Sequence, residues 1–242
     1  MALQHAQQVV PGVYRISLGI VNAFLLDSLD SLTLIDTGIP GSADKILAAV
    51  RELGKQPDAI RHLLVTHLHA DHTGSLAVLK AATGAPAYMH PADAALVREG
   101  LASRPMRPAP GLMPRVMFTM MRLRGAPVAT EAAAIEHEIN DGQTLPIAGG
   151  LQVIHAPGHS AGQVVFLWPQ QGGVLFVADA AGNIGNRLGP SIVYEDLALG
   201  METLTRLAHL SFEVACFGHG APIKTGADHL FRQKWGHSDA QR

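Results

Sequence analysis

The feature that most constrains this chain is the run His67-Leu68-His69-Ala70-Asp71-His72, which directly follows the expected strand from Ile60 to Thr66. At the frequencies of His and Asp in this sequence, chance would produce the pattern HxHxDH only about 0.002 times. Polar residues just beyond strand ends in an α/β fold collect along one edge of the sheet, where sites are built. We therefore expect a layered fold with a polar site beside this run.

Side-chain direction within the run follows from backbone geometry. In an extended segment side chains alternate, so His67, His69 and Asp71 can point to one side of the chain. His72 breaks this parity and joins them only if the chain turns, and Gly74 with the start of a helix near Ser75 predicts such a turn.

Composition limits the class of protein. Charged residues are 16% of the 242 and hydrophobic residues are 48%, against roughly 25% charged in an average soluble domain. This balance predicts many strands that are buried on both faces and excludes a disordered chain or a coiled coil. The apolar runs fall far short of the ~18 residues that a spanning helix needs. We expect one domain over residues 1–242.

The cellular setting is inferred from the first residues and from cysteine. The segment Met1 to Val10 lacks a basic start and a long apolar stretch, so we expect no secretory signal. Cys216 is the sole cysteine, which excludes an intrachain disulfide and favours a reducing, cytoplasmic location. A net charge of −2 gives no field for gathering nucleic acid. Thirteen histidines are the compositional anomaly, since histidine is the commonest metal ligand.

The order of the expected elements indicates two similar halves. The first half reads as three strands (Val9 to Leu18, Asn22 to Asp27, Ser31 to Asp36), a helix from Ser42 to Gly54, and further strand and helix units. Strands recur from Leu151 to Ala156, Val164 to Trp168, Val174 to Asp179 and Val214 to Gly218, with helices near Leu197 to Leu210 and from Asp228. We expect an α/β architecture in which two sheets pack face to face beneath outer helices.

A Pro-, Met- and Arg-rich insertion at about 91–141 separates these halves. It carries no acidic residue between Gly100 and Thr130, while Arg104, Arg107, Arg115, Arg122 and Arg124 make it locally cationic. One interpretation is a core-covering helix sealed by Met117, Met120 and Met121. The other is a helical lid that recognises an apolar or anionic substrate, and such a segment could equally serve a homodimer.

Further metal-ligand candidates stand beyond other strands. His159 lies in the turn after the strand ending at Ala156, Asp179 ends the strand from Val174, and His219 is flanked by two glycines after the strand from Val214. Catalytic metal centres usually combine ligands from distant loops. We interpret His62, His90, His137, His155 and the terminal or helical histidines as structural, and Cys216 as a core residue.

These motifs together resemble the metallo-β-lactamase superfamily over nearly the whole chain. HLHADH, the Asp36-Thr37-Gly38 turn, Pro157-Gly158-His159-Ser160, Asp179 and Gly218-His219-Gly220 occur in the family's order. The resemblance implies a four-layer αββα sandwich. It also implies that His67, His69 and His159 hold one metal, that Asp71, His72 and His219 hold a second, that Asp179 bridges the two, and that Asp36 steadies the ligand loop.

The chemistry expected of such a site is hydrolysis. Nitrogen and carboxylate ligands suit two divalent ions, with Zn²⁺ expected and iron or manganese as alternatives. Bound hydroxide would attack an acyl carbonyl, so no serine nucleophile is required. We expect Asp71 or Asp179 to move the proton. Tyr194 is a candidate oxyanion donor, with packing as its alternative role.

The resemblance narrows the substrate. An aspartate at position 179 resembles the thioesterase, lactonase and phosphodiesterase branches of the family and argues against β-lactam cleavage. His69 argues against the flavin-linked di-iron branch, which has glutamate at the matching position. Gly182 stands where acyl-homoserine-lactone hydrolases typically have tyrosine. Glyoxalase II enzymes are similar in the short interval from Asp179 to His219, but the twenty-three residues after His219 are expected to be too few for their helical glutathione-binding domain. We predict thioester or ester hydrolysis of a small acyl substrate, with a lactone as near neighbour.

Three other functions stay open. A mononuclear iron persulfide dioxygenase resembles glyoxalase II, and one iron with oxygen uptake would identify it. A phosphodiesterase or nuclease is disfavoured by the low global charge. A non-catalytic binding module is also disfavoured, because it would have no physical reason to keep a complete set of metal ligands.

Overall fold

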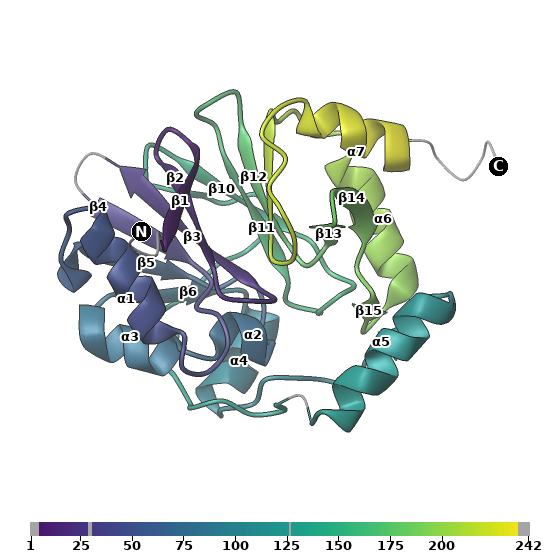
Figure 1. Cartoon of the computed structure of the whole chain (residues 1–242), viewed down its shortest axis with the longest axis horizontal. Coiled ribbons are helices and arrows are strands. Elements are labelled where there is room, and N and C mark those ends of the chain that lie inside the picture. Colours follow the sequence, from purple (N-terminus) through teal and green to yellow (C-terminus); the bar gives the residue numbers. More distant parts are fainter. Residues whose placement is uncertain (1–4, 29–30, 126, 237–242) are drawn as a thin grey trace.

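A computed structural model describes residues 5–28, 31–125 and 127–236. Two β-sheets pack face to face, and helices cover their outer surfaces (Figure 1). This arrangement confirms the expected four-layer α/β fold. Leu29 and Asp30, which separate two of the expected strands, and the terminal His237 lie outside the described residues.

The first sheet has seven strands in the order β1-β2-β3-β4-β5-β6-β8. Strands β1 to β4 are antiparallel neighbours, whereas β4, β5, β6 and β8 run parallel, so the end of β5 that leads into HLHADH lies beside the end of β4. The strands are β1 (Ala6–Val10), β2 (Val13–Ser17), β3 (Asn22–Ser28), β4 (Ser31–Ile35), β5 (Ile60–Leu64), β6 (Ala87–Met89) and β8 (His137–Glu138).

The second sheet has five strands in the order β16-β12-β11-β10-β9. Its β12 and β16 run parallel, so the segments that follow them leave the sheet at the same edge. The strands are β9 (Thr144–Leu145), β10 (Leu151–His155), β11 (Val164–Trp168), β12 (Val174–Ala178) and β16 (Val214–Phe217). Short pairs are formed by β13 (Ala181–Ile184) with β14 (Arg187–Pro190), and by β7 (Arg107–Pro108) with β15 (Val193–Tyr194).

Alternation along the strands creates the packed layers. In β3, Phe24 and Leu26 enter the core between the two sheets, while Leu25 enters the core beneath the outer helices. In β12, Phe176 faces the other sheet and Leu175 faces the opposite side. Because successive strand residues point to opposite faces, strands that are apolar throughout fill two cores at once.

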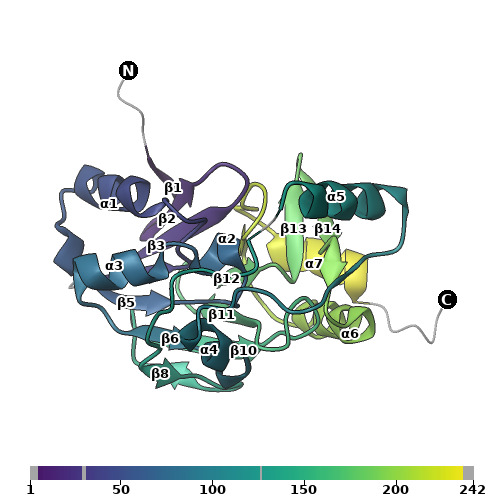
Figure 2. The same cartoon turned by 90° about the horizontal axis from the view of Figure 1, so that it is seen from below.

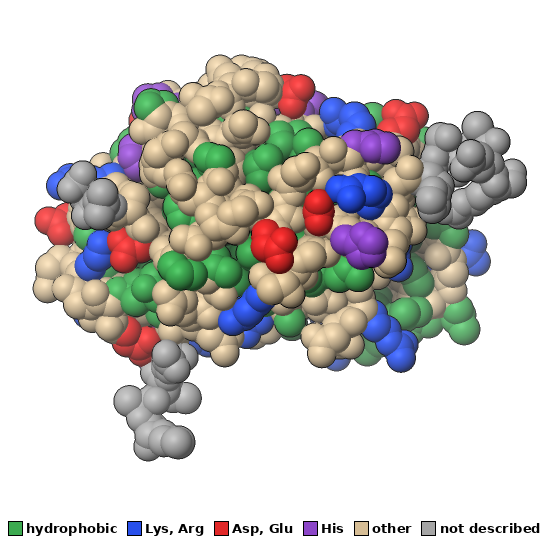
Figure 3. All heavy atoms as spheres, turned by 90° about the horizontal axis from the view of Figure 1, so that it is seen from above, with side chains coloured by type: hydrophobic (Ala, Val, Ile, Leu, Met, Phe, Trp, Pro, Cys, Tyr) green, Lys and Arg blue, Asp and Glu red, His purple; other side chains and the backbone are tan. Residues whose placement is uncertain are grey.

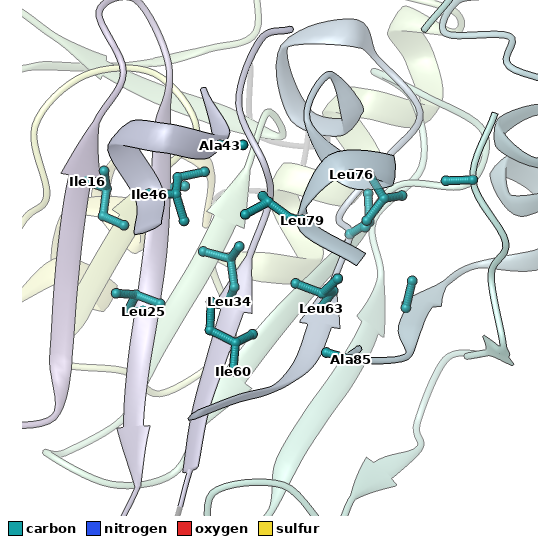
Figure 4. Packing of buried hydrophobic residues seen from close by; sticks show 14 of the residues in the cluster. Ile16, Leu25, Leu34, Ala43, Ile46, Ile60, Leu63, Leu76, Leu79 and Ala85 are labelled. Atoms are coloured by element: carbon teal, nitrogen blue, oxygen red, sulfur yellow. The ribbon is translucent and has the colours of Figure 1, made fainter. Parts of the chain in front are cut away.

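The outer helices complete these cores. Ile46 of α1 and Leu76 and Leu79 of α3 pack on Leu34 and Leu63 of the first sheet (Figure 4). Helices α6 and α7 cover the second sheet in the same way. The helices are α1 (Ala43–Glu52), α2 (Ala70–Thr73), α3 (Leu76–Thr83), α4 (Pro91–Arg98), α5 (Leu112–Leu123), α6 (Leu197–Leu207) and α7 (Ala227–Trp235), with a 3₁₀ turn at Pro57–Ala59.

Two expectations about local structure were wrong. The segment Val9 to Leu18 is not one strand but the hairpin of β1 and β2, because Gly12 adopts φ +81°, which supports a tight turn. In the HLHADH run, helix α2 begins at Ala70, so the extended alternation ends before Asp71. The chain turns earlier than predicted because Thr73 Oγ1 donates to the carbonyls of Leu68 and His69.

The insertion at 91–141 contains helices α4 and α5, strand β7, and strand β8, which extends the first sheet. Helix α5 lies away from the helices of the first sheet and is joined to the body by long connections (Figure 2). No residue of α5 is buried, so the interpretation of this helix as a core cover is wrong. Its Met117 and Met120 are exposed.

One face of the molecule has the mixture of side-chain types that is usual for the surface of a globular protein. Figure 3 shows a face on which acidic, basic, hydrophobic and neutral side chains are intermixed. Among the described helices, none combines the length and apolar character that would let it cross a membrane.

Candidate metal centre

The polar site lies where segments from both sheets meet. His67 and His69 follow β5, Asp71 and His72 stand on α2, and Asp36 follows β4. His159, Asp179 and His219 follow β10, β12 and β16 of the second sheet. The structure therefore brings all seven predicted ligand residues and Asp36 to one edge, as expected from the strand ends.

A first group consists of His67, His69 and His159. One ring nitrogen from each lies within 4.8 Å of the others, and all three side chains are buried. His69 Nδ1 and His159 Nε2 are only 2.9 Å apart. Three imidazoles that face one point can hold a divalent cation.

A second group consists of Asp71, His72 and His219, whose ligand atoms also lie within 4.8 Å of one another. His219 Nε2 is 3.3 Å from Asp71 Oδ2. In contrast to the buried first group, the side chains of Asp71 and His219 are 28% and 27% exposed. The centre therefore opens to solvent on the side of the second group.

Asp179 lies between the two groups. Its Oδ1 is 3.4 Å from His72 Nε2, and its Oδ2 is 3.5 Å from His159 Nε2 and 3.1 Å from His219 Nε2. One carboxylate thus faces both groups of potential ligands. This is the position that a bridging carboxylate requires.

The opposite nitrogens of the imidazoles are held by the protein. His72 Nδ1 is 2.7 Å from Asp36 Oδ2, and His219 Nδ1 is 2.7 Å from the Ile20 carbonyl. His159 Nδ1 is 2.9 Å from the Val193 carbonyl. These contacts orient each Nε2 toward the centre, as expected around metal-bound histidines.

Charge differs between the two groups. Burial, reinforced by the neighbouring histidines, lowers the pKa of His67 well below its usual value and that of His69 to about 3. Burial also opposes charge on His72 and His219, but Asp179 outweighs it and holds the pKa of both well above the usual value. The same two histidines keep the pKa of Asp179 low against its burial.

Unpaired polar atoms indicate that these residues fit cations. Nε2 of His67, His69 and His72 and Oδ1 of Asp179 are buried without a hydrogen-bond partner among the described residues, which is costly unless another group satisfies them. Gly218 keeps the space free, since a Cβ there would collide with Asp179 Oδ1 and approach His72. The His and Asp groups are therefore able to bind metal ions.

Asp36 acts as expected, because it joins the HLHADH loop to the end of β4. Its Oδ1 accepts a hydrogen bond of 2.8 Å from the Thr66 amide, while Oδ2 faces His72. The residue adopts φ +61° although it is not glycine, a conformation that persists only where surrounding contacts enforce it.

Asp93 of α4 was missed from the sequence. This fully buried carboxylate accepts hydrogen bonds from the amides of Leu68 (3.0 Å) and Gly162 (3.0 Å) and from Ser160 Oγ (2.7 Å). It thereby ties the loop of His69 to the loop of His159. Arg104 Nη1 completes the cluster at 2.6 Å, so this arginine serves the site's framework rather than a free lid surface.

Asn22 was also missed. Its side-chain amide donates to the carbonyls of Phe217 (3.0 Å) and Gly220 (2.8 Å), which fixes the loop that carries His219. The partners lie 195 and 198 residues away in sequence, so no local pattern identifies this residue or Asp93.

Tyr194 lies behind the His159 loop. It is buried, and a Cβ at Gly200 of α6 would collide with its ring, so the ring packs directly on that glycine. Gly200 in turn lies against Gly158, which directly precedes His159. Burial raises the pKa of Tyr194 to about 12. Among the described residues, no hydrogen bond or ion pair joins Tyr194 to the seven predicted ligands.

The remaining histidines of the described chain lie outside the metal-binding groups. His90 and His155 stack on each other with ring centroids 4.3 Å apart, and His137 stacks on Tyr88. His62 Nδ1 lies 3.1 Å from the hydroxyl of Tyr88. Cys216 is buried in the core between the sheets, where burial raises the pKa of its thiol.

Comparison with known proteins gives one family for most of the chain. The model described as "Metallo-beta-lactamase superfamily" matches residues 16–219. The uncharacterized protein YobT of Bacillus subtilis is 32% identical over 165 residues, which are 66% of this chain and 61% of YobT. A hydroxyacylglutathione hydrolase of Albidiferax ferrireducens is 32% identical over 148 residues, which are 60% of this chain and 43% of that protein. The chain thus spans less than two thirds of either relative.

Solved structures share the fold. BJP-1, a subclass B3 metallo-beta-lactamase of Bradyrhizobium japonicum, matches with a TM-score of 0.70 and 20% identity over 96% of this chain and 90% of that chain. At this level of identity the likeness concerns the fold, and the chemistry must be argued from the residues of the centre.

Proposed function

Because the chain belongs to the metallo-beta-lactamase superfamily, we propose that it is a dinuclear metal-dependent hydrolase that cleaves a thioester or ester, with a lactone as the nearest alternative substrate. The observation that carries this proposal is the position of Asp179, which faces His159 of the first ligand group and His72 and His219 of the second. One carboxylate shared by two ligand groups supports two ions rather than one.

The ligand set supports zinc, with iron or manganese as alternatives, because it offers imidazole and carboxylate but no thiolate. His67, His69 and His159 would hold one ion, and Asp71, His72 and His219 the other, with Asp179 between them. Bound divalent ions would supply an activated water and an electrophile for a carbonyl oxygen.

The protein's own groups support the remaining steps. Asp71 reaches solvent while it faces His219, so it is placed to pass a proton out of the centre. Asp36, through His72, and the Ile20 carbonyl, through His219, keep two imidazoles in fixed tautomers. Such fixed groups avoid reorganisation when charge develops in the transition state.

Apolar residues beside the opening support an acyl substrate. Ile20 is 76% exposed, and its carbonyl contacts His219. Ile184 is 56% exposed and follows Asn183, whose backbone amide donates a hydrogen bond to the His219 carbonyl. Two exposed isoleucines flanking one ligand favour a substrate with an apolar acyl part near a polar scissile bond.

The test combines metal analysis with a substrate panel. We expect about two metal ions per chain, hydrolysis of a thioester or lactone, and slow turnover of phosphodiesters. Asp179→Asn should lose metal and activity together, whereas Asp44→Asn, an exposed control on α1, should keep both. One iron per chain with oxygen uptake would identify a dioxygenase and overturn the proposal.

A further inference from the structure

Helix α5 presents an unusual apolar surface, which we call the α5 outer face. Six of its apolar side chains are exposed, among them Leu123 at 82%, Leu112 at 80% and Met113 at 69%. An apolar patch of this kind on the surface of a soluble domain marks an interaction site. The face consists of Leu112, Met113, Val116, Met117, Met120 and Leu123.

Helical geometry places these residues together. At 3.6 residues per turn they fall within an arc of about 140° around the helix axis. The half-buried residues Pro114, Phe118 and Met121 occupy the opposite, less exposed side of the helix. The apolar stripe of this amphipathic helix therefore points outward, which is the reverse of a helix that covers a core.

Positive charge accompanies the face. Arg107, Arg115, Arg122 and Arg124 are exposed, and their side chains form no hydrogen bond or ion pair within the described part of the chain. No acidic residue occurs between Gly100 and Thr130. A partner for this surface must therefore be apolar and negatively charged.

We propose that the α5 outer face docks this protein on an anionic lipid surface, with α5 lying in the plane of the interface. A helix of 12 residues is too short to cross a bilayer but suits insertion at the boundary between headgroups and acyl chains. The apolar stripe enters this boundary, and the arginines contact anionic headgroups.

A second copy of the chain fits this face less well. Antiparallel packing of two α5 helices would bring Arg115 of one copy near Arg122 and Arg124 of the other. Since the segment carries no acid to pair with them, these like charges would repel. A nucleic acid would satisfy the arginines but leave the six apolar side chains in water.

The test is co-sedimentation of the full chain with vesicles of phosphatidylcholine, with or without phosphatidylglycerol. We expect binding to the anionic vesicles, weaker binding at high salt, and little binding to the neutral ones. The variant Arg115→Gln/Arg122→Gln/Arg124→Gln should lower the partition coefficient on the order of 100-fold, at about fivefold per arginine. Met117→Ser/Met120→Ser should lower it as well.

A matched control separates local from global charge. Lys45→Gln/Arg51→Gln/Arg61→Gln removes the same net charge from exposed positions outside the insertion and should leave vesicle binding within a few-fold. Far-UV circular dichroism and metal content should be unchanged in every variant. Because the readout is binding, it is independent of the proposed hydrolysis.

Three results would overturn the proposal. Absent binding, or equal binding to neutral and anionic vesicles, would exclude an anionic lipid partner. An equal loss in the control variant would show that net charge alone attracts the protein. Light scattering that finds a dimer, which Met117→Ser/Met120→Ser converts to a monomer, would assign the face to a second copy.

Discussion

Asp36 Oδ2 accepts a hydrogen bond of 2.7 Å from His72 Nδ1, and this contact joins the end of β4 to helix α2 across 36 residues of sequence. Both side chains are buried. The carboxylate accepts only, so Nδ1 keeps a proton, and Nε2, which is directed at the centre, is the nitrogen that gives up its proton when metal binds. One short contact thus sets the tautomer of a predicted ligand.

Asp36→Asn should weaken metal binding about 10–100-fold, the range usual for residues that orient metal-bound histidines. The amide removes the charge that favours this tautomer, while the fold is retained. Competition with a chromophoric chelator measures the affinity, with Asp44→Asn as control. Unchanged affinity would show that His72 does not depend on Asp36.

Asp93→Asn should destabilise the protein by about 3 kcal/mol, the low end for a broken buried ion pair, because Arg104 loses its partner at 2.6 Å but keeps Glu195 at 3.3 Å. The carboxylate accepts from Leu68, Ser160 and Gly162 as well, and an amide cannot accept from all four donors. Urea denaturation of the metal-free protein measures the loss. Stability equal to that of Asp58→Asn, an exposed control, would show that Asp93 does not hold the loops of His69 and His159 together.

Tyr194→Phe distinguishes packing from catalysis. The ring lies on Gly200 of α6, so we expect kcat/KM within a few-fold of the parent. Tyr194→Ala should lower stability, since it leaves a cavity beside the His159 loop. A drop of about 100-fold or more in kcat for the Phe variant would instead assign the hydroxyl a role in stabilising the transition state.

Metal affinity should depend on pH differently in the two groups. The pKa of His67 and His69 is lowered by burial, so these rings are neutral in the metal-free protein and compete with few protons. The pKa of His72 and His219 is raised, chiefly because Asp179 outweighs burial, so metal must displace their protons.

Lowering the pH from about 8 to about 6 should therefore weaken the Asp71, His72 and His219 group by about tenfold per pH unit for each proton displaced. The other group should hardly change. Titration of the metal-free protein with Zn²⁺ at both pH values measures the two affinities. Equal weakening of both groups would contradict the raised pKa of His72 and His219.

The fold and the convergence of the seven residues could be predicted from sequence because both follow from local rules. Strand alternation identified the layers, and the positions after strand ends identified the edge where His159, Asp179 and His219 meet HLHADH. The hairpin at Gly12 was missed although the Pro11-Gly12 pair between its two strands is a turn signal.

The framework of the site could not be predicted in this way. Asp93 bonds residues 25 and 69 positions away, and Asn22 bonds the loop of His219 from the far end of the chain. Each looks like an ordinary polar residue in its own segment. The outward stripe of α5 was equally hidden, because the same pattern of Met and Leu would serve a helix that faces inward.

The rate of thioester hydrolysis during addition of Zn²⁺ to the metal-free protein tests the central claim most directly. We predict no turnover at the start, a rise with added metal, and a plateau at about two ions per chain. A rate of hydrolysis that does not depend on added Zn²⁺, or a Zn²⁺-loaded protein that hydrolyses neither thioester nor lactone, would contradict the account.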